Sequence, residues 1–109
     1  MRFAVHIIAD AERDLLDIYQ YVAQNDSREN ARELLRHIEQ VILKLESMPL
    51  RGRYPPELKR IGVLEFREVF FKPYRVIYRV VGNAVYVMLI ADGRRDMMTL
   101  LQRSLLSAK

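Results

Sequence analysis

The sequence predicts an α+β fold in which a helical hairpin covers one face of a mostly antiparallel four-stranded sheet. Apolar residues recur at steps of three and four through 11–22 and again through 31–48, as on the buried face of a helix. The spacing changes to a period of two between 64 and 91, as in half-buried strands. The resulting order of strand, helix, helix, three strands and helix indicates one domain, 1–109.

The N-terminal half contains the first strand and the two long helices. Residues 2–8 are expected to form a short strand. Asp10 is the expected N-cap of the first helix, and Ser27 that of the second, since both side chains can accept a backbone hydrogen bond. The second helix is expected to continue through Met48 and to end at Pro49, which cannot donate an intrahelical hydrogen bond.

The C-terminal half contains a loop, a three-stranded meander and a last helix. Residues 49–62 are expected to form a basic loop, because three prolines and two glycines are concentrated there. The strands are expected at 64–71, 74–81 and 84–91, with tight turns between them. Helical spacing returns over 95–107.

A two-residue turn at Gly82-Asn83 predicts the register of the last hairpin. The predicted pairs on one face are Val81 with Ala84, Arg79 with Tyr86, Ile77 with Met88, and Arg75 with Ile90. The alternate set carries no charge and is expected to face the helices. The outer face then combines Arg75 and Arg79 with an apolar patch, which indicates that something covers it: the terminal helix, a partner's peptide, or both in turn. A purely structural alternative for Arg79 is stacking on Tyr86 and pairing with a glutamate such as Glu68.

Charge is distributed unevenly along the chain, which carries a net charge of +4. Residues 1–50 hold 6 Lys/Arg and 9 Asp/Glu, whereas residues 51–109 hold 12 and 5. This asymmetry predicts an anionic partner, either nucleic acid or an acidic protein. No cysteine is present, no leader is evident, and no apolar run approaches the ~20 residues of a membrane helix, so we expect a cytoplasmic protein. His6 and His37 lie on different elements, so neither a metal nor a cofactor is expected.

Four segments resemble the ParE branch of the ParE/RelE toxins. They are Pro-Leu-Arg-Gly-Arg at 49–53, Gly-Val-Leu-Glu-Phe-Arg-Glu-Val-Phe at 62–70, Pro-Tyr-Arg-Val-Ile-Tyr-Arg-Val at 73–80 and Asp-Gly-Arg-Arg-Asp at 92–96. The resemblance extends over essentially the whole chain. It implies the toxin of a type II toxin–antitoxin system, associated with growth arrest and plasmid stabilisation and neutralised by an antitoxin encoded beside it. ParE-like members poison DNA gyrase, whereas RelE-like members cut messenger RNA on the ribosome.

The residues at the RelE-like catalytic positions favour the gyrase poison. Arg75 and Arg95 fall at the two arginine positions of that pattern. Phe66 and Glu68 stand about where its lysines would be, and Leu101 where its tyrosine would be. Cutting RNA requires groups that transfer protons, and this set supplies none that is evident. A ribosome-dependent ribonuclease is therefore the first alternative, and a non-toxic family member that only binds an antitoxin is the second.

We expect an antitoxin-binding or toxicity face, and no catalytic residue. Its predicted members are Arg75, Arg79, Tyr86, Met88, Ile90, Arg94, Arg95, Leu101 and Leu105. The flexible, acidic amphipathic segment of an antitoxin would suit this apolar, arginine-bearing surface. The sequence has no helix-turn-helix signature, so operator DNA is expected to be bound only through the antitoxin.

Overall fold

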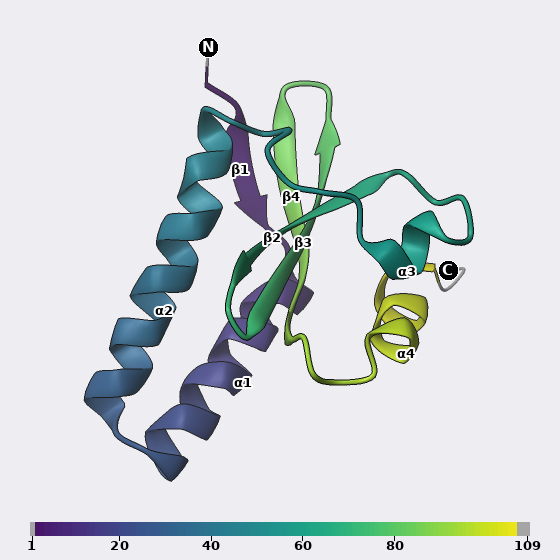
Figure 1. Ribbon diagram of the computed structural model, residues 1–109. Coiled ribbons are helices and arrows are strands. Elements are labelled where there is room, and N and C mark those ends of the chain that lie inside the picture. The colour runs from purple at the N-terminus through teal and green to yellow at the C-terminus, as the bar shows by residue number, and fades with distance from the viewer. Residues whose placement is uncertain (1, 107–109) are drawn as a thin grey trace.

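A four-stranded sheet organises the computed structural model, which describes residues 2–106 (Figure 1). The strands are β1 (Ala4–Ile7), β2 (Phe66–Phe71), β3 (Tyr74–Val81) and β4 (Ala84–Asp92), in the spatial order β1-β4-β3-β2. β2, β3 and β4 form the antiparallel meander, whereas β1 pairs with β4 in parallel. The predicted α+β fold is confirmed, with a mixed sheet that contains one parallel pair.

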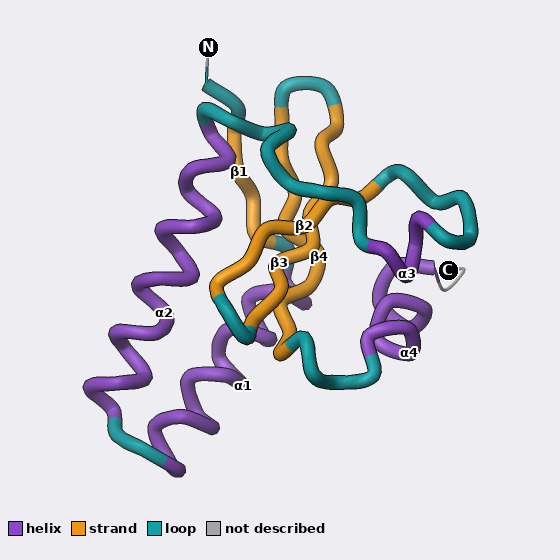
Figure 2. Tube along the Cα trace, viewed as in Figure 1, coloured by secondary structure: helices purple, strands orange, loops and turns teal. Residues whose placement is uncertain are grey.

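The helical hairpin consists of α1 (Ala9–Asn25) and α2 (Arg28–Leu43), which lie together on one side of the sheet (Figures 1 and 2). Ser27 caps α2 as predicted, since its hydroxyl accepts a hydrogen bond from the Asn30 N–H at 3.0 Å. The predicted cap at Asp10 is wrong. Helix α1 begins two residues earlier than that cap implies, because the extended Ile8 already accepts the Glu12 N–H at 2.9 Å.

The second helix ends earlier than predicted. A 3₁₀ turn, Lys44–Glu46, follows α2, and the side chain of Met48 is exposed. The Glu46 carbonyl accepts a hydrogen bond from the Phe3 N–H at 2.8 Å, which ties this turn to the start of β1. The tighter turn keeps Leu45 in the core while the chain turns towards Pro49.

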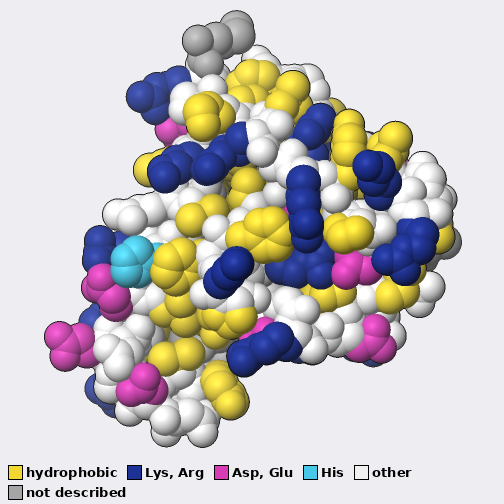
Figure 3. Space-filling view, in the orientation of Figure 1, with side chains coloured by type: hydrophobic (Ala, Val, Ile, Leu, Met, Phe, Trp, Pro, Cys, Tyr) yellow, Lys and Arg dark blue, Asp and Glu magenta, His cyan; other side chains and the backbone are white. Residues whose placement is uncertain are grey.

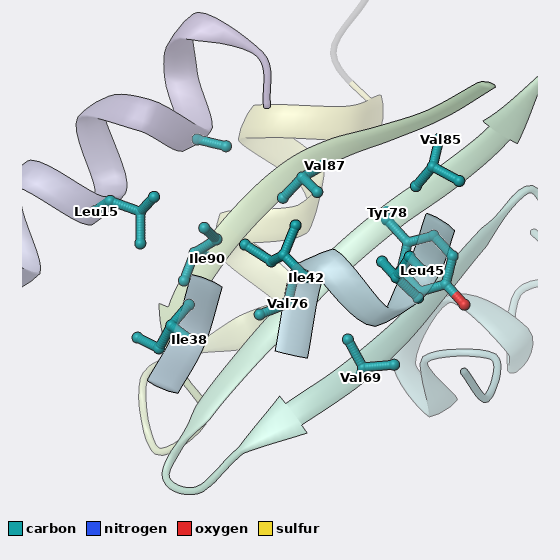
Figure 4. Packing of buried hydrophobic residues seen from close by; sticks show 11 residues of the cluster. Leu15, Ile38, Ile42, Leu45, Val69, Val76, Tyr78, Val85, Val87 and Ile90 are labelled. Carbon is teal, nitrogen blue, oxygen red and sulfur yellow. The ribbon is translucent and has the colours of Figure 1, made fainter. Parts of the chain in front are cut away.

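The main hydrophobic core fills the space between the helical hairpin and the sheet (Figure 4). Ile38, Ile42 and Leu45 from the α2 side meet Val76 and Tyr78 of β3, all of them almost fully buried. The helices contribute residues three or four apart and the strand contributes alternate residues, as the two backbone geometries require.

The register of the last hairpin changes at a β-bulge. Arg79 pairs with Tyr86 as predicted, but the pairing shifts between Ile77 and Tyr78. The predicted pairs beyond that point are wrong: Ile77 lies opposite Leu89, and Arg75 lies opposite Ala91. Met88 is the extra residue of β4. The bulge sends Ile90 to the helical side and Leu89 and Ala91 to the opposite face.

Two short helices cover that opposite face. The loop predicted at 49–62 contains α3 (Pro56–Lys59), which was not predicted, and the last helix, α4 (Met97–Leu101), continues as a π-helical turn, Gln102–Leu106. Asp96 caps α4 by accepting the Thr99 N–H at 3.2 Å, so the helix begins two residues later than expected. Position 107, the predicted end, lies outside the described residues. No helix within residues 2–106 is long and apolar enough to cross a membrane.

Candidate partner-binding site

Arg75 lies on the predicted outer face, but two glutamates of the same chain enclose it. Its Nε donates to Glu68 Oε1 at 2.7 Å, and its two terminal nitrogens donate to the carboxylate oxygens of Glu57, each at 2.8 Å. Arg75 is 8% exposed and Glu68 only 1%. The guanidinium of Arg75, which was predicted to face an external anionic group, therefore holds α3 against the sheet.

The ion pairs also determine how these groups titrate. The guanidinium of Arg75 lowers the pKa of Glu57 from 4.5 to about 2, mainly by donating hydrogen bonds to its carboxylate. In turn Glu57 and Glu68 raise the pKa of Arg75 above its ordinary value. Glu68 Oε2 accepts a further bond from Arg53 Nε at 2.8 Å, so two arginines and two carboxylates form one neutral network.

Three of the predicted site residues belong to a second hydrophobic cluster beneath α3 and α4. Leu101 is fully buried there, and Met88 and Leu105 pack against the cluster while partly exposed. Leu58 of α3 and Met97 of α4 complete its cover. The terminal helix of the chain itself thus occupies the outer sheet face, which was the first of the three covers that the sequence suggested.

Arg79 and Tyr86 lie opposite each other on β3 and β4, as predicted, but their side chains have other partners. The Arg79 guanidinium is 3.9 Å from a Glu65 carboxylate oxygen, and 44% of its side chain is exposed. The Tyr86 ring stacks on His6, with ring centroids 5.1 Å apart. The structural alternative for Arg79 therefore holds in part: its nearest carboxylate is a glutamate, Glu65 in place of Glu68, which is engaged by Arg75 and Arg53, and the ring of Tyr86 stacks on His6.

Arg94 and Arg95 lie at the rim of a groove between α1 and the ends of β3 and β4. The groove has a volume of about 420 Å³, and Ile90 contributes to its wall. Arg94 is fixed by Asp92, whose carboxylate accepts bonds from its backbone N–H and its guanidinium. Both arginines are exposed, as is Arg79, so these three of the nine predicted residues are open to a partner.

The other side of this groove was not predicted. Asp14, Tyr21 and Tyr74 line it, and Asp14 accepts a hydrogen bond from the Ile90 N–H at 2.9 Å. Burial raises the pKa of Asp14, although that hydrogen bond opposes the shift. The spacing of Asp14 on α1 gave no indication of this bond, because the bond depends on how the helix lies across β4.

The described residues offer little for catalysis at the positions considered above. Phe66, Glu68 and Leu101 are all buried, so none presents a proton-transferring group at the surface. In residues 2–106, no group of three or more His, Asp or Glu side chains is arranged to hold a metal ion. The arrangement as a whole provides two exposed arginines beside a groove and an apolar face closed by a short helix.

Residues 5–97 match the model of a family described as the ParE toxin of the parDE type II toxin–antitoxin system. Toxin ParE3 of Caulobacter vibrioides is 33% identical over 84 residues, which cover 77% of this chain and 80% of the relative. The family match includes α1, α2 and the whole meander.

Solved structures share the fold at lower sequence identity. A structure described as the chromosomal ParDE system of P. aeruginosa superposes with a TM-score of 0.71 at 19% identity, covering 84% of this chain and 96% of the other. The RelBE2 toxin–antitoxin complex of Mycobacterium tuberculosis gives 0.63 at 18% identity, covering 84% and 92%. A mutant of E. coli toxin RelE in the free state gives 0.52 at 15% identity, covering 92% and 93%.

Proposed function

Since the chain belongs to the ParE toxin family of type II toxin–antitoxin systems, we propose that it arrests growth by inhibiting DNA gyrase in the cytoplasm and that a cognate antitoxin neutralises it. The observation that carries this proposal is the family match over residues 5–97. Gyrase as the target follows from the resemblance of the 62–70 and 92–96 segments to the ParE branch.

The buried positions on the outer face favour a poison over a ribonuclease. General acid–base cleavage of RNA needs a proton-transferring side chain within hydrogen-bond reach of the substrate. Glu68 gives its carboxylate to two arginines, and Leu101 lies fully inside the second cluster. Arg75 is also engaged by two carboxylates, so it is not open to a phosphate in this conformation.

The exposed members of the predicted face are proposed to contact the antitoxin or the target. These are Arg79 on β3 and Arg94 and Arg95 at the rim of the groove, together with the partly exposed Tyr86 on β4. Exposed arginines steer an acidic segment towards the surface and can bind its carboxylates bidentately. Met88, Leu101, Leu105 and Arg75 are proposed to act indirectly, by holding α3 and α4 in place, and Ile90 by packing in the main core under the helical hairpin.

The function is tested by expressing the chain from a tightly controlled promoter, alone and with the product of the neighbouring gene. We expect growth arrest with altered plasmid supercoiling or broken DNA, intact transcripts, and rescue by co-expression. The purified chain should also inhibit supercoiling by purified gyrase. Transcripts cut within translated regions would transfer the assignment to the ribonuclease, and normal growth with tight antitoxin binding would transfer it to the non-toxic alternative.

The surface assignment is tested with Arg94→Gln/Arg95→Gln, compared with Arg28→Gln/Arg32→Gln on α2, which removes the same charge from exposed positions elsewhere. We expect the first variant to weaken antitoxin binding or toxicity and the second to leave both unchanged. Equal behaviour of the two variants in both assays would remove Arg94 and Arg95 from the site.

A further inference from the structure

A second groove, separate from that of Arg94 and Arg95, runs along the outer edge of β2. Lys44, Arg51, Arg53 and Phe70 line it. Figure 3 shows Lys and Arg side chains spread across the middle of this side of the molecule, with hydrophobic side chains between them. In this groove, Lys44 from the end of α2 and two arginines from the 49–55 segment lie beside the aromatic ring of Phe70, on the edge strand β2.

The charge at this groove is not balanced within the chain. Arg53 is neutralised by Glu68 in the four-group network with Arg75. Lys44 and Arg51 are exposed, and no carboxylate in residues 2–106 lies within ion-pair distance of either. Arg67 donates only to neutral groups, among them the Gly52 carbonyl at 2.9 Å, so it also keeps its charge.

The segment that presents Arg51 and Arg53 is held rigidly. The buried Tyr78 hydroxyl donates to the Pro49 carbonyl at 2.7 Å and accepts from the Gly52 N–H at 3.0 Å. The Arg53 backbone pairs with that of Glu68 through two hydrogen bonds, of 3.1 and 2.8 Å. Little conformational entropy is therefore lost when a ligand binds this segment.

Phe70 is the one exposed apolar side chain among those that line the groove; 39% of it is accessible. The Arg53 guanidinium lies over its ring, 4.8 Å from the ring centroid. Outside the groove, the Arg67 guanidinium lies 4.6 Å from the ring centroid of Tyr54. An acidic helix would need a continuous aliphatic strip, whereas a planar ring among cations suits a stacked base.

We propose that this groove binds single-stranded nucleic acid, with backbone phosphates at Lys44 and Arg51 and a base stacked on Phe70. Cations that follow the backbone and an aromatic ring that accepts any base are the elements of sequence-independent single-strand binding. Such binding needs no helix-turn-helix motif. It does not depend on gyrase inhibition, because the contact is made by the chain alone.

The test measures fluorescence anisotropy of a labelled single-stranded DNA 20-mer of mixed sequence, titrated with the purified full chain between 50 and 200 mM salt. The Lys44→Gln/Arg51→Gln variant should bind about tenfold more weakly at low salt and reduce the log–log salt slope by roughly 1.4, for two lost phosphate contacts. Phe70→Ala should weaken binding without changing that slope. Arg28→Gln/Arg32→Gln is the control, since it has the same net charge and lies at the opposite end of α2.

Circular dichroism and thermal melting establish that each variant is folded before binding is compared. If the groove variant and the control bind the oligonucleotide equally, only the net charge of the protein matters and not its position. That result would overturn the proposal. Poly-L-glutamate and unlabelled single-stranded DNA are also compared as competitors at matched charge concentration. If both displace the labelled oligonucleotide equally well, the proposal is overturned in favour of an acidic protein partner.

Discussion

Replacing Glu57 with glutamine tests whether the ion pair with Arg75 stabilises the cover of the outer sheet face. A pKa lowered from 4.5 to about 2 corresponds to about 3 kcal/mol of stabilisation, at about 1.4 kcal/mol per pKa unit. Solvent screens part of this, because 22% of the side chain is exposed, and the glutamine oxygen still accepts a hydrogen bond. We therefore expect Glu57→Gln to lower the free energy of unfolding at pH 7 by about 2 kcal/mol, and the melting temperature by about 10 °C.

The pH dependence of this stability difference is a more specific test than its size at pH 7. Because the pKa of Glu57 is lower in the folded state, its stabilisation is fully present above about pH 4.5 and is lost as the pH falls towards 2. Urea unfolding of the native chain and Glu57→Gln should therefore give curves that converge between pH 4.5 and 2. Glu65→Gln is the control, since Glu65 is 63% exposed and 3.9 Å from Arg79. A constant difference across this range, or an equal loss in the control, would refute the reasoning.

Three further predictions concern packing and burial. Leu101→Ala should lower the free energy of unfolding by about 3 kcal/mol, because the side chain is fully buried, whereas Leu106→Ala on the same terminal segment should cost under about 1 kcal/mol in the same urea titration. Tyr78→Phe should cost about 2 kcal/mol in thermal melts, because it leaves the buried Gly52 N–H without its acceptor. Asp14→Asn should be at least as stable as the native chain at pH 7, where the ionised carboxylate is penalised by burial. This advantage should shrink as the pH falls through the raised pKa of Asp14, as unfolding at several pH values would show.

The element order could be predicted because it depends on local patterns. The period of the apolar residues distinguishes helices from strands, and the Gly82-Asn83 turn correctly sets the pairing of Arg79 with Tyr86. The Ser27 cap follows from chemistry within four residues. By contrast, the parallel pairing of β1 depends on where the chain goes after the first strand, which no local pattern contains.

The candidate site was harder to predict because its partners are distant in sequence. The outer-face position of Arg75 could be inferred from alternation, but the two carboxylates that enclose it come from α3 and β2. Helix α3 has only four residues and begins with proline, too short to show a helical period. The groove beside Arg95 includes Asp14, whose bond to β4 depends on the tertiary packing of α1.

The extra residue at Met88 has a consequence for which insertions and deletions the last hairpin can accept. Before the bulge, Val85 and Val87 send their side chains towards the helical hairpin, whereas after it Ile90 does so and Leu89 faces α4. The parity of inward-facing positions therefore inverts within a single strand. A residue added at the Gly82-Asn83 turn would lengthen an exposed tip, whereas loss of Met88 would remove the bulge and leave a regular ladder in which Val87 and Ile90 still face the helical hairpin and Leu89 still faces α4. Met88 is therefore a position at which β4 can lose a residue without exchanging side chains between the two cores.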